Sequence, residues 1–422
     1  LKHRGRWRGA GHSRRRRALG AMAPVTVGRR DPYAGSAGAR QGWSFSSRAR
    51  PRGNRTRPST VCRSVALFRA YLLCVVATGD IVLEPHGSVT DIAHFNYAVE
   101  SKLYAERSDV VFVTTRGAGG IHARAANATV TVLSVADPAR PRVVESWPVP
   151  ASVEGQDMYQ GWLVVCDIGR GGLYIFDSSC VACGPVSYLD LSIDAVLHVR
   201  VFGAADGAVY ALATSGFAEH PAGALVAVDI SDVLAPREVL VADVGVCEPE
   251  GIAVRGGYAY VGGVCDTQLA VVSLLELPAA MPVVQRLRDG AYVQAVSTPR
   301  PVGDGSAMLA ALWGRPGGLA AFALDAQGGA RELGRAVGNR TSRANRVAVE
   351  RSTAFCPLEA EVGGVAAFDV RALASPRLAA VVDLPAGTCY CLFAKDGYVH
   401  AFAAQTSTMH SFVVRPEPSL VF

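Results

Sequence analysis

One short sequence phrase recurs along this 422-residue chain. It reads GGLYIFDSS at 171–179, AGALVAVDIS at 222–231, GGLAAFALD at 317–325 and GGVAAFDV at 363–370. A second set of apolar runs begins at residues 109, 161, 207, 256, 306, 352 and 397, with starts 45 to 52 residues apart. Four short β-type runs in a unit of this length are typical of propeller blades. We therefore predict an all-β, seven-bladed β-propeller, with six or eight blades as alternatives.

The residue types within each unit agree with this fold. Runs of Val, Ala, Leu, Phe and Tyr with little strict alternation indicate strands that are buried on both faces. The Ala pairs in LAAF and VAAF would let neighbouring blades approach. A Gly before the third strand supplies a positive φ, and the Asp after it can bond its own backbone and start a turn. A Pro then opens an outer strand, where its missing N–H does least harm.

Two long stretches resemble a known repeat family. They are GYAYVGGVCDTQLAVVSLLELPAAMPVVQRL at 257–287 and AVYALATSGFAEHPAGALVAVDISDVLAPREVLVADVG at 208–245. Both are similar to the LVIVD-repeat β-propeller family, and the resemblance covers residues 90–422. It implies seven blades and a protein that is often secreted or surface-associated, with no established catalytic residues to transfer. The unit near 308 departs from the pattern by lacking the Pro-rich turn, and the last unit is compressed.

Charge is strongly segregated between the two ends of the chain. Residues 1–79 hold 18 of the 42 Lys and Arg residues and a single acid, Asp31, whereas residues 80–422 hold 24 basic and 35 acidic residues. The acidic body gives no reason to expect nucleic acid as a partner. Residues 1–63 are rich in Arg, Ser, Gly and Pro without apolar periodicity, and we predict a disordered basic leader there.

An apolar segment at 64–79 separates this leader from the propeller at 80–422. Its run is too short for a membrane span and contains Arg69,. Small residues before Asp80 fit a cleaved targeting sequence, and an N-terminal membrane anchor or an internal helix are the alternatives. We expect a secretory, extracellular or cell-surface protein, with a plastid or another organelle as the alternative.

Polar residues in or before the first strand of each unit should gather where the channel of a propeller opens. They are His94, Asn96, Glu154, Asp157, Asp194, Glu248, Glu250, Gln294, Asn345 and Arg346. A ring of carboxylate and amide oxygens is what Ca²⁺ requires, and Glu154, Asp194, Glu248 and Asn345 are the candidate metal ligands. A solvated rim without any ligand is the plain alternative.

The loops between second and third strands reach the same face, and their length and charge vary as in a binding surface. Its candidate residues are Arg170, Glu219, His220, Asp266, Arg315 and Glu359, and Arg116, His122 and Glu361 lie in the same loops. No Ser-His-Asp order, Walker loop, Rossmann fingerprint or paired-His zinc motif appears in a confirming context.

The ten cysteines bear on the compartment. CVAC at 180–183 could be half a zinc site or a redox pair, but no second CxxC completes it. Cys247 and Cys265 should lie near the same face, and Cys356 could approach Cys389 or Cys391 across neighbouring blades. We predict disulfides at these positions, consistent with a secretory route, and buried free thiols are the alternative.

These observations lead to three functional hypotheses. The first is a non-enzymatic, monomeric interaction module that binds a protein or carbohydrate partner through its loop-bearing face. The second is a Ca²⁺-dependent or other metal-dependent hydrolase or lactonase that uses carboxylates at the channel mouth. The third is an intracellular scaffold.

Overall fold

The fold was analysed in a computed structural model of the chain. It describes residues 76–77, 81–118, 128–215, 223–263, 268–288, 291–302, 305–314, 316–360, 363–385 and 387–416. The predicted leader, and all of the apolar segment except Val76 and Ala77, lie outside these residues. No helix in the described part of the chain is long and apolar enough to span a membrane.

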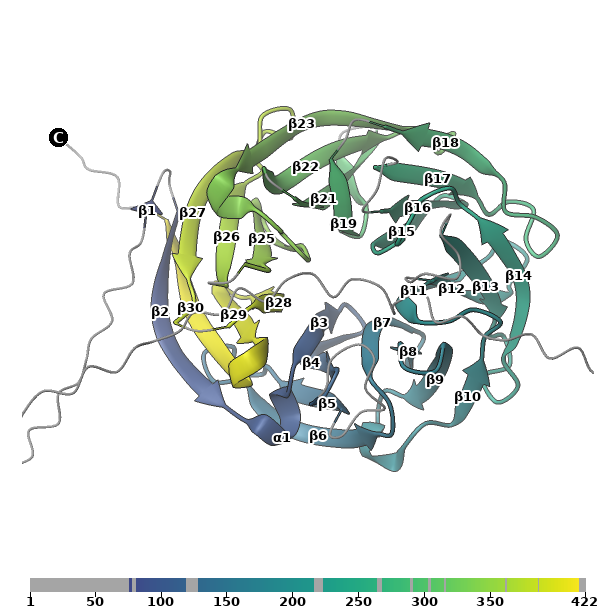
Figure 1. The fold of residues 1–422 in the computed structure, drawn as a ribbon, viewed down its shortest axis with the longest axis horizontal. Coiled ribbons are helices and arrows are strands. Elements are labelled where there is room, and N and C mark those ends of the chain that lie inside the picture. The colour runs from purple at the N-terminus through teal and green to yellow at the C-terminus, as the bar shows by residue number, and fades with distance from the viewer. Residues whose placement is uncertain are drawn as a thin grey trace, which may run out of the picture. The chain divides into compact units, whose positions relative to one another are not determined.

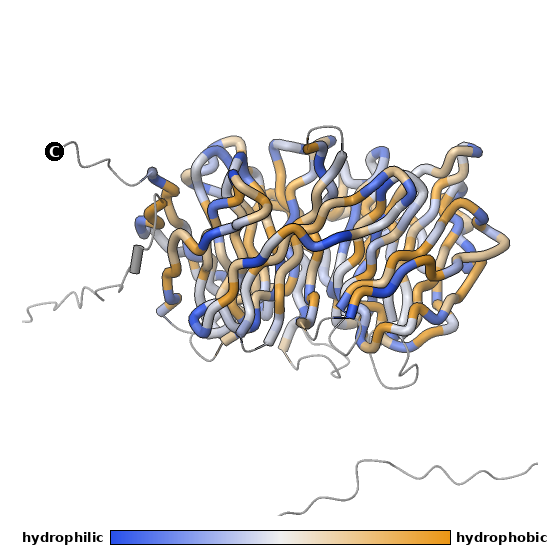
Figure 2. Tube along the Cα trace, turned by 90° about the horizontal axis from the view of Figure 1, so that it is seen from above, coloured by the Kyte–Doolittle hydropathy of each residue, from blue (hydrophilic) through white to orange (hydrophobic). Residues whose placement is uncertain are grey.

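Seven small antiparallel sheets stand around a central channel, which confirms the predicted seven-bladed β-propeller (Figure 1). Each of the seven runs predicted from the sequence forms the second strand of a blade, counted from the channel outward. Seen from the side, the strands run between the two faces of a flat ring, and many turns at these faces are hydrophilic (Figure 2).

The first four blades follow one another without interruption. Blade 1 comprises β3 (Ala98–Tyr104), β4 (Arg107–Thr115), β5 (Ala128–Ser134) and β6 (Arg142–Val149). Blade 2 comprises β7 (Val153–Tyr159), β8 (Trp162–Asp167), β9 (Gly172–Asp177) and β10 (Ser187–Asp190). Blade 3 comprises β11 (Val196–Gly203), β12 (Val209–Ser215), β13 (Ala224–Asp229) and β14 (Arg237–Asp243). Blade 4 comprises β15 (Ile252–Arg255), β16 (Tyr258–Gly262), β17 (Leu269–Ser273) and β18 (Val283–Leu287).

The remaining blades carry additions to this pattern. Blade 5 comprises β19 (Tyr292–Val296), β21 (Gly305–Trp313), β22 (Gly317–Leu324) and β23 (Ala330–Gly338), and β20 (Arg300–Val302) pairs with β21. Blade 6 comprises β24 (Ala348–Glu350), β25 (Thr353–Leu358), β26 (Gly364–Asp369) and β27 (Arg377–Asp383), with β1 (Val76–Ala77) added outside β27. Blade 7 comprises β28 (Cys389–Lys395), β29 (Tyr398–Ala403), β30 (Thr408–Pro416) and β2 (Ile81–Thr90).

Four short helical elements complete the described secondary structure. They are α1 (Ile92–Phe95) and the 3₁₀ helices η1 (Val181–Cys183), η2 (Asn339–Thr341) and η3 (Ala404–Thr406). Asp91 caps α1 by accepting hydrogen bonds from the backbone N–H groups of Ala93 and His94,.

The outermost strand of blade 7 comes from the other end of the chain. β2 pairs with β30 along its length, from Ile81 opposite Pro416 to Thr90 opposite Thr408. This pairing joins the first described long strand to the last, so the ring is closed by main-chain hydrogen bonds. It also explains why the last unit looks compressed in the sequence, because residues 389–416 supply only three of its four strands.

The hydrophobic core is divided among the seven contacts between successive blades. For example, one cluster joins Phe112 of blade 1 to Leu163 and Phe176 of blade 2, and another joins Phe402 of blade 7 to Val111 of blade 1. The Ala pairs behave as predicted, since Ala366 packs toward blade 5 and Ala367 toward blade 7, both fully buried. The second and third strands of the blades, such as β8, β13 and β26, bury both faces, which is why their runs lack a polar alternation,.

The predicted turn chemistry is also confirmed. Oδ1 of Asp177, Asp229, Asp325 and Asp369 each accepts a hydrogen bond from the backbone N–H two residues later,. Gly171 has φ of 77°, and a Cβ there would collide with the carbonyl oxygen of Ile193. Only glycine therefore fits at this entry to the third strand.

We call the face that carries the loops before the innermost strands and the loops between second and third strands the loop face. The hairpins that join first to second strands lie on the opposite face, the hairpin face. The innermost strands run from the loop face to the hairpin face, so residues at their beginnings surround the loop-face mouth of the channel.

Candidate functional site

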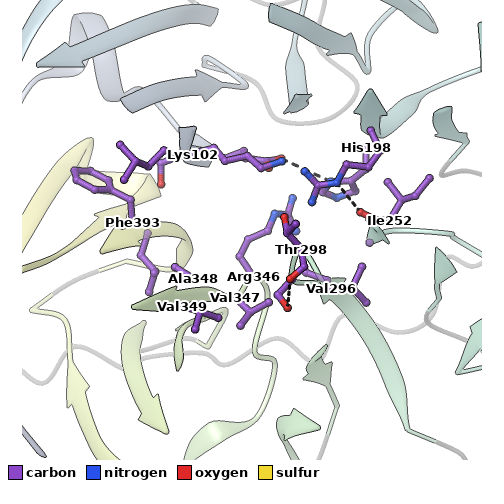
Figure 3. A pocket seen from close by; sticks show the side chains of 18 of the residues that line it. Lys102, His198, Ile252, Val296, Thr298, Arg346, Val347, Ala348, Val349 and Phe393 are labelled. Atoms are coloured by element: carbon purple, nitrogen blue, oxygen red, sulfur yellow. Dashed lines mark hydrogen bonds and ion pairs between the residues drawn. The ribbon is translucent and has the colours of Figure 1, made fainter. Parts of the chain in front are cut away.

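The channel contains a cavity of about 350 Å³ (Figure 3). It is lined by the innermost strands, or the residues just before them, from every blade except blade 2. Residues Glu100 and Lys102 on β3, and His198 and Arg200 on β11, lie two positions apart in their strands, which places each pair on one side of the strand. In β7, a register shift between Val153 and Gln156 accompanies the burial of both Glu154 and Asp157,.

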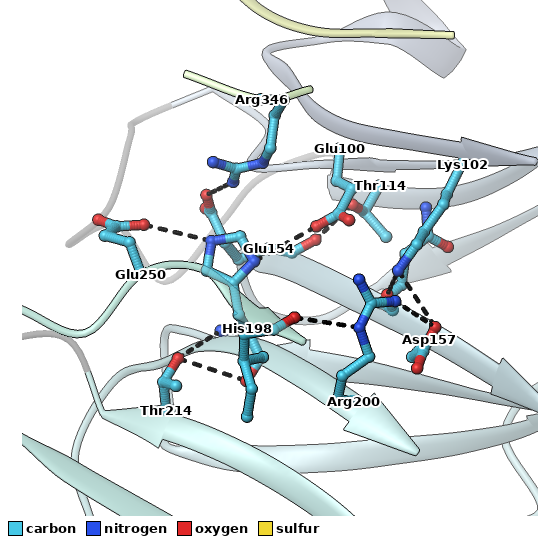
Figure 4. A network of polar contacts seen from close by, with 12 residues as sticks. Glu100, Lys102, Thr114, Glu154, Asp157, His198, Arg200, Thr214, Glu250 and Arg346 are labelled. Carbon is cyan, nitrogen blue, oxygen red and sulfur yellow. Dashed lines mark hydrogen bonds and ion pairs between the residues drawn. The ribbon is translucent and has the colours of Figure 1, made fainter. Parts of the chain in front are cut away.

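Two arginines neutralise Glu154 at the loop-face mouth, and one of them, Arg346, is seen beside it in Figure 4. Arg116 Nε lies 2.5 Å from Glu154 Oε2, and Arg346 Nη2 lies 3.2 Å from Oε1. The Glu154 side chain is only 3% exposed. Burial opposes the charge of Arg116, yet Glu154 outweighs it and raises the pKa of this guanidinium. These two ion pairs connect blades 1, 2 and 6 across the channel.

His198 lies between two carboxylates in the same network. Its Nε2 is 3.2 Å from Glu250 Oε2, and its Nδ1 is 3.6 Å from Glu100 Oε2. Burial and the nearby Arg346 lower the pKa of His198 to about 3, so the imidazole is neutral at pH 7. Burial also raises the pKa of Glu250. A neutral imidazole can donate from one nitrogen and accept at the other, which suits it to positioning and binding.

A second ionic cluster lies deeper in the channel. Asp157 Oδ1 is 2.9 Å from Arg200 Nη1 and 3.1 Å from Lys102 Nζ, and its Oδ2 accepts from the backbone N–H of Val201 at 2.8 Å. Burial would raise the pKa of Asp157, but Arg200 and Lys102 hold it below its ordinary value. Arg200 Nε also donates to the carbonyl of Ile252 at 3.1 Å. These contacts connect four consecutive blades.

The four predicted metal ligands are placed differently from one another. Glu154 is paired with arginines, and Asn345 donates to Glu359 Oε2 at 2.9 Å while its Oδ1 accepts from Arg346 at 2.5 Å. Asp194 and Glu248 are exposed in turns. Within the described ranges, no group of three or more His, Cys, Asp or Glu side chains is arranged to hold a metal ion. The buried Glu154 carboxylate has guanidinium groups as counter-ions, which come from blades 1 and 6.

Of the other polar residues predicted at the mouth, Glu250, Gln294, Asp157 and Arg346 do lie at the channel. Gln294, buried on β19, hydrogen bonds Glu250. His94 instead belongs to α1, where its Nδ1 lies 2.8 Å from Asp91 Oδ2.

Aromatic and arginine side chains form an arc on the loop face. The Tyr97 and Tyr390 hydroxyls are 3.1 Å apart, and the Arg116 guanidinium lies 5.9 and 5.6 Å from the centroids of these two rings. The Arg343 guanidinium lies 5.0 Å from the Trp313 ring, whose Nε1 donates to Glu359 at 3.1 Å. Tyr97, Tyr390, Trp313 and Arg343 are half-buried. We call Tyr97, Arg116, Trp313, Arg343 and Tyr390 the aromatic arc.

The predicted binding-face residues are only partly described. Arg170 is exposed in the turn between β8 and β9, and Glu359 contacts the aromatic arc through Trp313. Glu219, His220, Asp266 and Arg315, and also His122 and Glu361, lie outside the described residues.

The cysteine predictions have different outcomes. Cys180 and Cys183 form a disulfide around η1, so CVAC is not half of a zinc site here. Cys247 is disulfide-bonded, while Cys265 lies outside the described residues. Cys356, Cys389 and Cys391 are buried free thiols, so the predicted bridge between blades 6 and 7 is wrong. Cys356 and Cys389 lie in the apolar clusters between blades, where they pack as small hydrophobic residues,.

Sequence reasoning missed four polar residues of the channel, namely the charged Glu100, Lys102 and Arg200 and the neutral His198. A signal for them does exist: in VESKLY and LHVRVF, charged or polar residues occur at every second position of otherwise apolar strands. Such spacing indicates a strand with one face toward a polar channel. Their pairing with Asp157 and Glu250 depends on contacts between blades and has no local signal.

Similarity to solved structures is at the level of the fold, with low sequence identity. No family model matches the chain, and no curated protein does either. The chain is similar to a functionally unknown protein from Desulfotomaculum acetoxidans DSM 771, with 12% identity and a TM-score of 0.50 over 71% of this chain and 98% of that one. It is also similar to BamB from Moraxella catarrhalis, with 11% identity and a TM-score of 0.47 over 79% of this chain and 100% of that one. The membership in the LVIVD-repeat family stays a prediction, and what is shown is the β-propeller fold.

Proposed function

We propose that this propeller is a non-enzymatic interaction module that binds a protein or carbohydrate partner through its loop face. The observation that carries the proposal is the aromatic arc. It runs over blades 5, 6, 7 and 1, and its Tyr, Trp and Arg343 side chains are partly exposed, whereas Arg116 is buried beneath the tyrosines. These three residue types dominate the energetics of protein interfaces, because they combine a large apolar surface with a polar end.

The arc is held in place before any partner arrives. Trp313 is fixed by its hydrogen bond to Glu359, which in turn accepts from Asn345. Arg116 is fixed by Glu154 below it and by two tyrosine rings beside it. Side chains that are already ordered lose little conformational entropy on binding. The ordered side chains of the aromatic arc are therefore suited to binding a partner.

The charge network below the arc supports binding more than catalysis. Glu154 and Asp157 each have two cationic partners, so neither is a free base. The ion pairs of these two carboxylates connect blades 1, 2, 3 and 6, and they make the channel mouth a rigid support for the aromatic arc.

We further propose that the module acts on the secretory route, secreted or at the cell surface. The Cys180–Cys183 disulfide and the disulfide-bonded Cys247 support this location, because disulfides persist in oxidising compartments. An organelle lumen is the alternative. Determining the N-terminus of the mature protein from its native source tests the location: a chain that begins near Asp80 supports it, and a retained leader opposes it.

The binding proposal is tested by comparing how the wild type and two surface variants bind candidate partners. Wild-type protein, a Trp313→Ala/Tyr390→Ala variant and a Val144→Ser control on the exposed outer strand β6 are incubated with extracellular proteins and with a glycan array. We expect specific binding that the control keeps and the arc variant loses. Equal binding by all three proteins would show that the arc is not the recognition surface.

The alternative is a metal-dependent hydrolase at the channel mouth. The observation in its favour is the position of His198 between Glu100 and Glu250 beside the cavity, since a histidine held by carboxylates can move a proton. This alternative predicts ester or lactone hydrolysis that a chelator abolishes and that His198→Gln removes. The interaction module predicts no turnover with or without added divalent ions.

A further inference from the structure

The cavity in the channel has a cationic lining. Its charged residues are Glu100, Lys102, Arg200, Arg300 and Arg346. The lining extends from the ionic network near the loop face to Thr298 and Arg300, which follow β19 on the hairpin-face side. A ligand in this cavity would therefore meet more positive than negative side chains, and it would not occupy the aromatic arc.

Arg300 is the cation of the lining that has no acidic partner within ion-pair distance among the described residues, whereas Lys102, Arg200 and Arg346 share carboxylates within the ionic network. Lys102 and Arg200 share the single carboxylate of Asp157, and Arg346 shares Glu154 with Arg116. Arg300 donates to a carbonyl, that of Arg351, at 3.1 Å, and partial burial lowers its pKa. A desolvated cation is costly without an anionic partner. An anion in the cavity would give Arg300 a negatively charged partner through charge-assisted hydrogen bonds.

Two buried polar atoms of the lining have no hydrogen-bond partner among the described residues. They are Arg346 Nε, a donor, and Glu100 Oε2, an acceptor that lies 3.6 Å from the His198 ring. Leaving a buried donor or acceptor unpaired is destabilising. A molecule that satisfies both atoms must carry an acceptor for the guanidinium and a donor for the carboxylate.

Apolar side chains also line the cavity, and its volume limits the size of the occupant. Ile252, Val296, Leu392 and Phe393 contribute to the walls. A volume of about 350 Å³ is within the range of small-molecule sites, which are concave, mostly apolar and supplied with a few convergent polar groups.

We propose that this cavity binds a small hydroxylated organic anion, either a hydroxycarboxylate or a phosphate ester. Its anionic group lies among Arg346, Arg200 and Lys102, and one of its hydroxyls donates to Glu100. Arg300 attracts the anion at the hairpin-face end. The site is independent of the partner-binding surface proposed above.

Isothermal titration of the full-length protein with defined probes tests this proposal. Gluconate and glycerol 3-phosphate represent the two anion types, glucose and glycerol are their neutral counterparts, and hexanoate is an anion without hydroxyls. We expect saturable binding of gluconate or glycerol 3-phosphate, no binding of the neutral compounds, and affinity for hexanoate that is weaker by about tenfold. Whichever anion binds identifies the class.

Three variants connect the binding to the named residues. Arg300→Gln should weaken the binding of every anion by about tenfold. Glu100→Met removes the acceptor at similar length, so the preference for gluconate or glycerol 3-phosphate over hexanoate should disappear. Arg237→Gln on the outer strand β14, whose side chain is 74% exposed, is the control and should bind like the wild type.

The proposal fails if no anion binds saturably, because water alone would then occupy the cavity. It fails also if glucose binds as well as gluconate, because the negative charge would then not be recognised. It also fails if Arg300→Gln and Glu100→Met bind as the wild type does while melting normally. The Trp313→Ala/Tyr390→Ala variant separates the two proposals: it should lose its macromolecular partner and keep the anion.

Discussion

Glu154 and Arg346 are 192 residues apart in the chain, and they meet across the channel with Nη2 and Oε1 at 3.2 Å. Because Arg116 reaches the other oxygen of the same carboxylate, one buried side chain of blade 2 connects blades 1 and 6. A buried charge of this kind is strongly destabilising when its partner is removed, since the remaining charges stay desolvated.

We expect Glu154→Gln to lower the free energy of unfolding by about 3–5 kcal/mol. The neutral amide leaves the buried Arg116 and Arg346 without the carboxylate that they share. Thermal or urea melting of the purified protein measures the effect. Arg340→Gln is the control, because the Arg340–Asp383 pair is 42% and 48% exposed and should contribute about 0–1 kcal/mol. Equal effects of the two substitutions would contradict the claim that the ion pairs of Glu154 stabilise the ring.

Closure of the ring should depend on one apolar residue of β2. Leu83 is fully buried in the cluster between blades 6 and 7, whereas most of β2 is exposed. Leu83→Ala should cost about 2–5 kcal/mol of stability, measured by urea melting. Val89→Ala on the same strand, 51% exposed, should change stability by at most about 0.5 kcal/mol. If Leu83→Ala also melts like the wild type, β2 does not close the ring.

The stability of the protein should fall as the pH drops below 6.5. His400 is buried between Pro138, whose carbonyl accepts from Nε2 at 2.8 Å, and Ser411. Burial lowers the pKa of His400 to about 4. Between about pH 6.5 and pH 4 the unfolded chain therefore binds a proton that the folded chain does not, so stability is lost as pH falls.

The magnitude for one histidine is about 1.4 kcal/mol per pH unit in that window. His400→Gln keeps a side-chain donor for Pro138 but cannot titrate, so the stability advantage of the wild type over the variant should shrink from pH 7 to pH 5. Urea melting at three pH values measures this difference. If the difference in free energy of unfolding between the wild type and the variant stays constant or grows toward pH 5, His400 is not a buried neutral histidine.

The state of the cysteines should be visible by mass spectrometry. With N-ethylmaleimide in denaturant and no reductant, Cys166, Cys356, Cys389 and Cys391 should be labelled, because they are free thiols. Cys180, Cys183 and Cys247 should stay unlabelled until reduction, because they are in disulfides. Peptide mapping assigns each label. In the native protein the four thiols should react slowly, since all are buried. Labelling of Cys180 and Cys183 without reductant would contradict the structure.

The repeat made most of the fold predictable from the sequence. The seven second strands and the Asp turns are specified by residues close together in the chain, such as Gly171 and Asp177, and local chemistry is what a sequence pattern records. β2 was missed as a blade strand, because IVLEPHGSVT contains Pro85 and Gly87 and has only Leu83 buried. Its partner β30 lies at the other end of the chain, so no local pattern could assign it.

The site was predicted in position but not in chemistry. Glu154, Asn345 and Arg346 were expected at the channel mouth and do lie there. The carboxylate and amide oxygens of these residues suggested a metal cation. The positive groups beside Glu154 are instead the guanidinium groups of Arg116 and Arg346. Which positive group neutralises a carboxylate is decided by the distance between side chains of remote blades, and that distance follows from the ring geometry. Asp194 and Glu248 precede first strands as well, but their turns place them in solvent.

The account depends most on the claim that arginines, rather than a metal, are the counter-ions of Glu154. Calcium titration calorimetry, combined with thermal melting before and after a chelator, tests it on the wild type and on Glu154→Gln. We predict no saturable calcium binding, an unchanged melting temperature after chelation, and a large fall in melting temperature caused by Glu154→Gln alone. Stoichiometric calcium binding that stabilises the wild type and disappears in Glu154→Gln would contradict the account and favour the hydrolase.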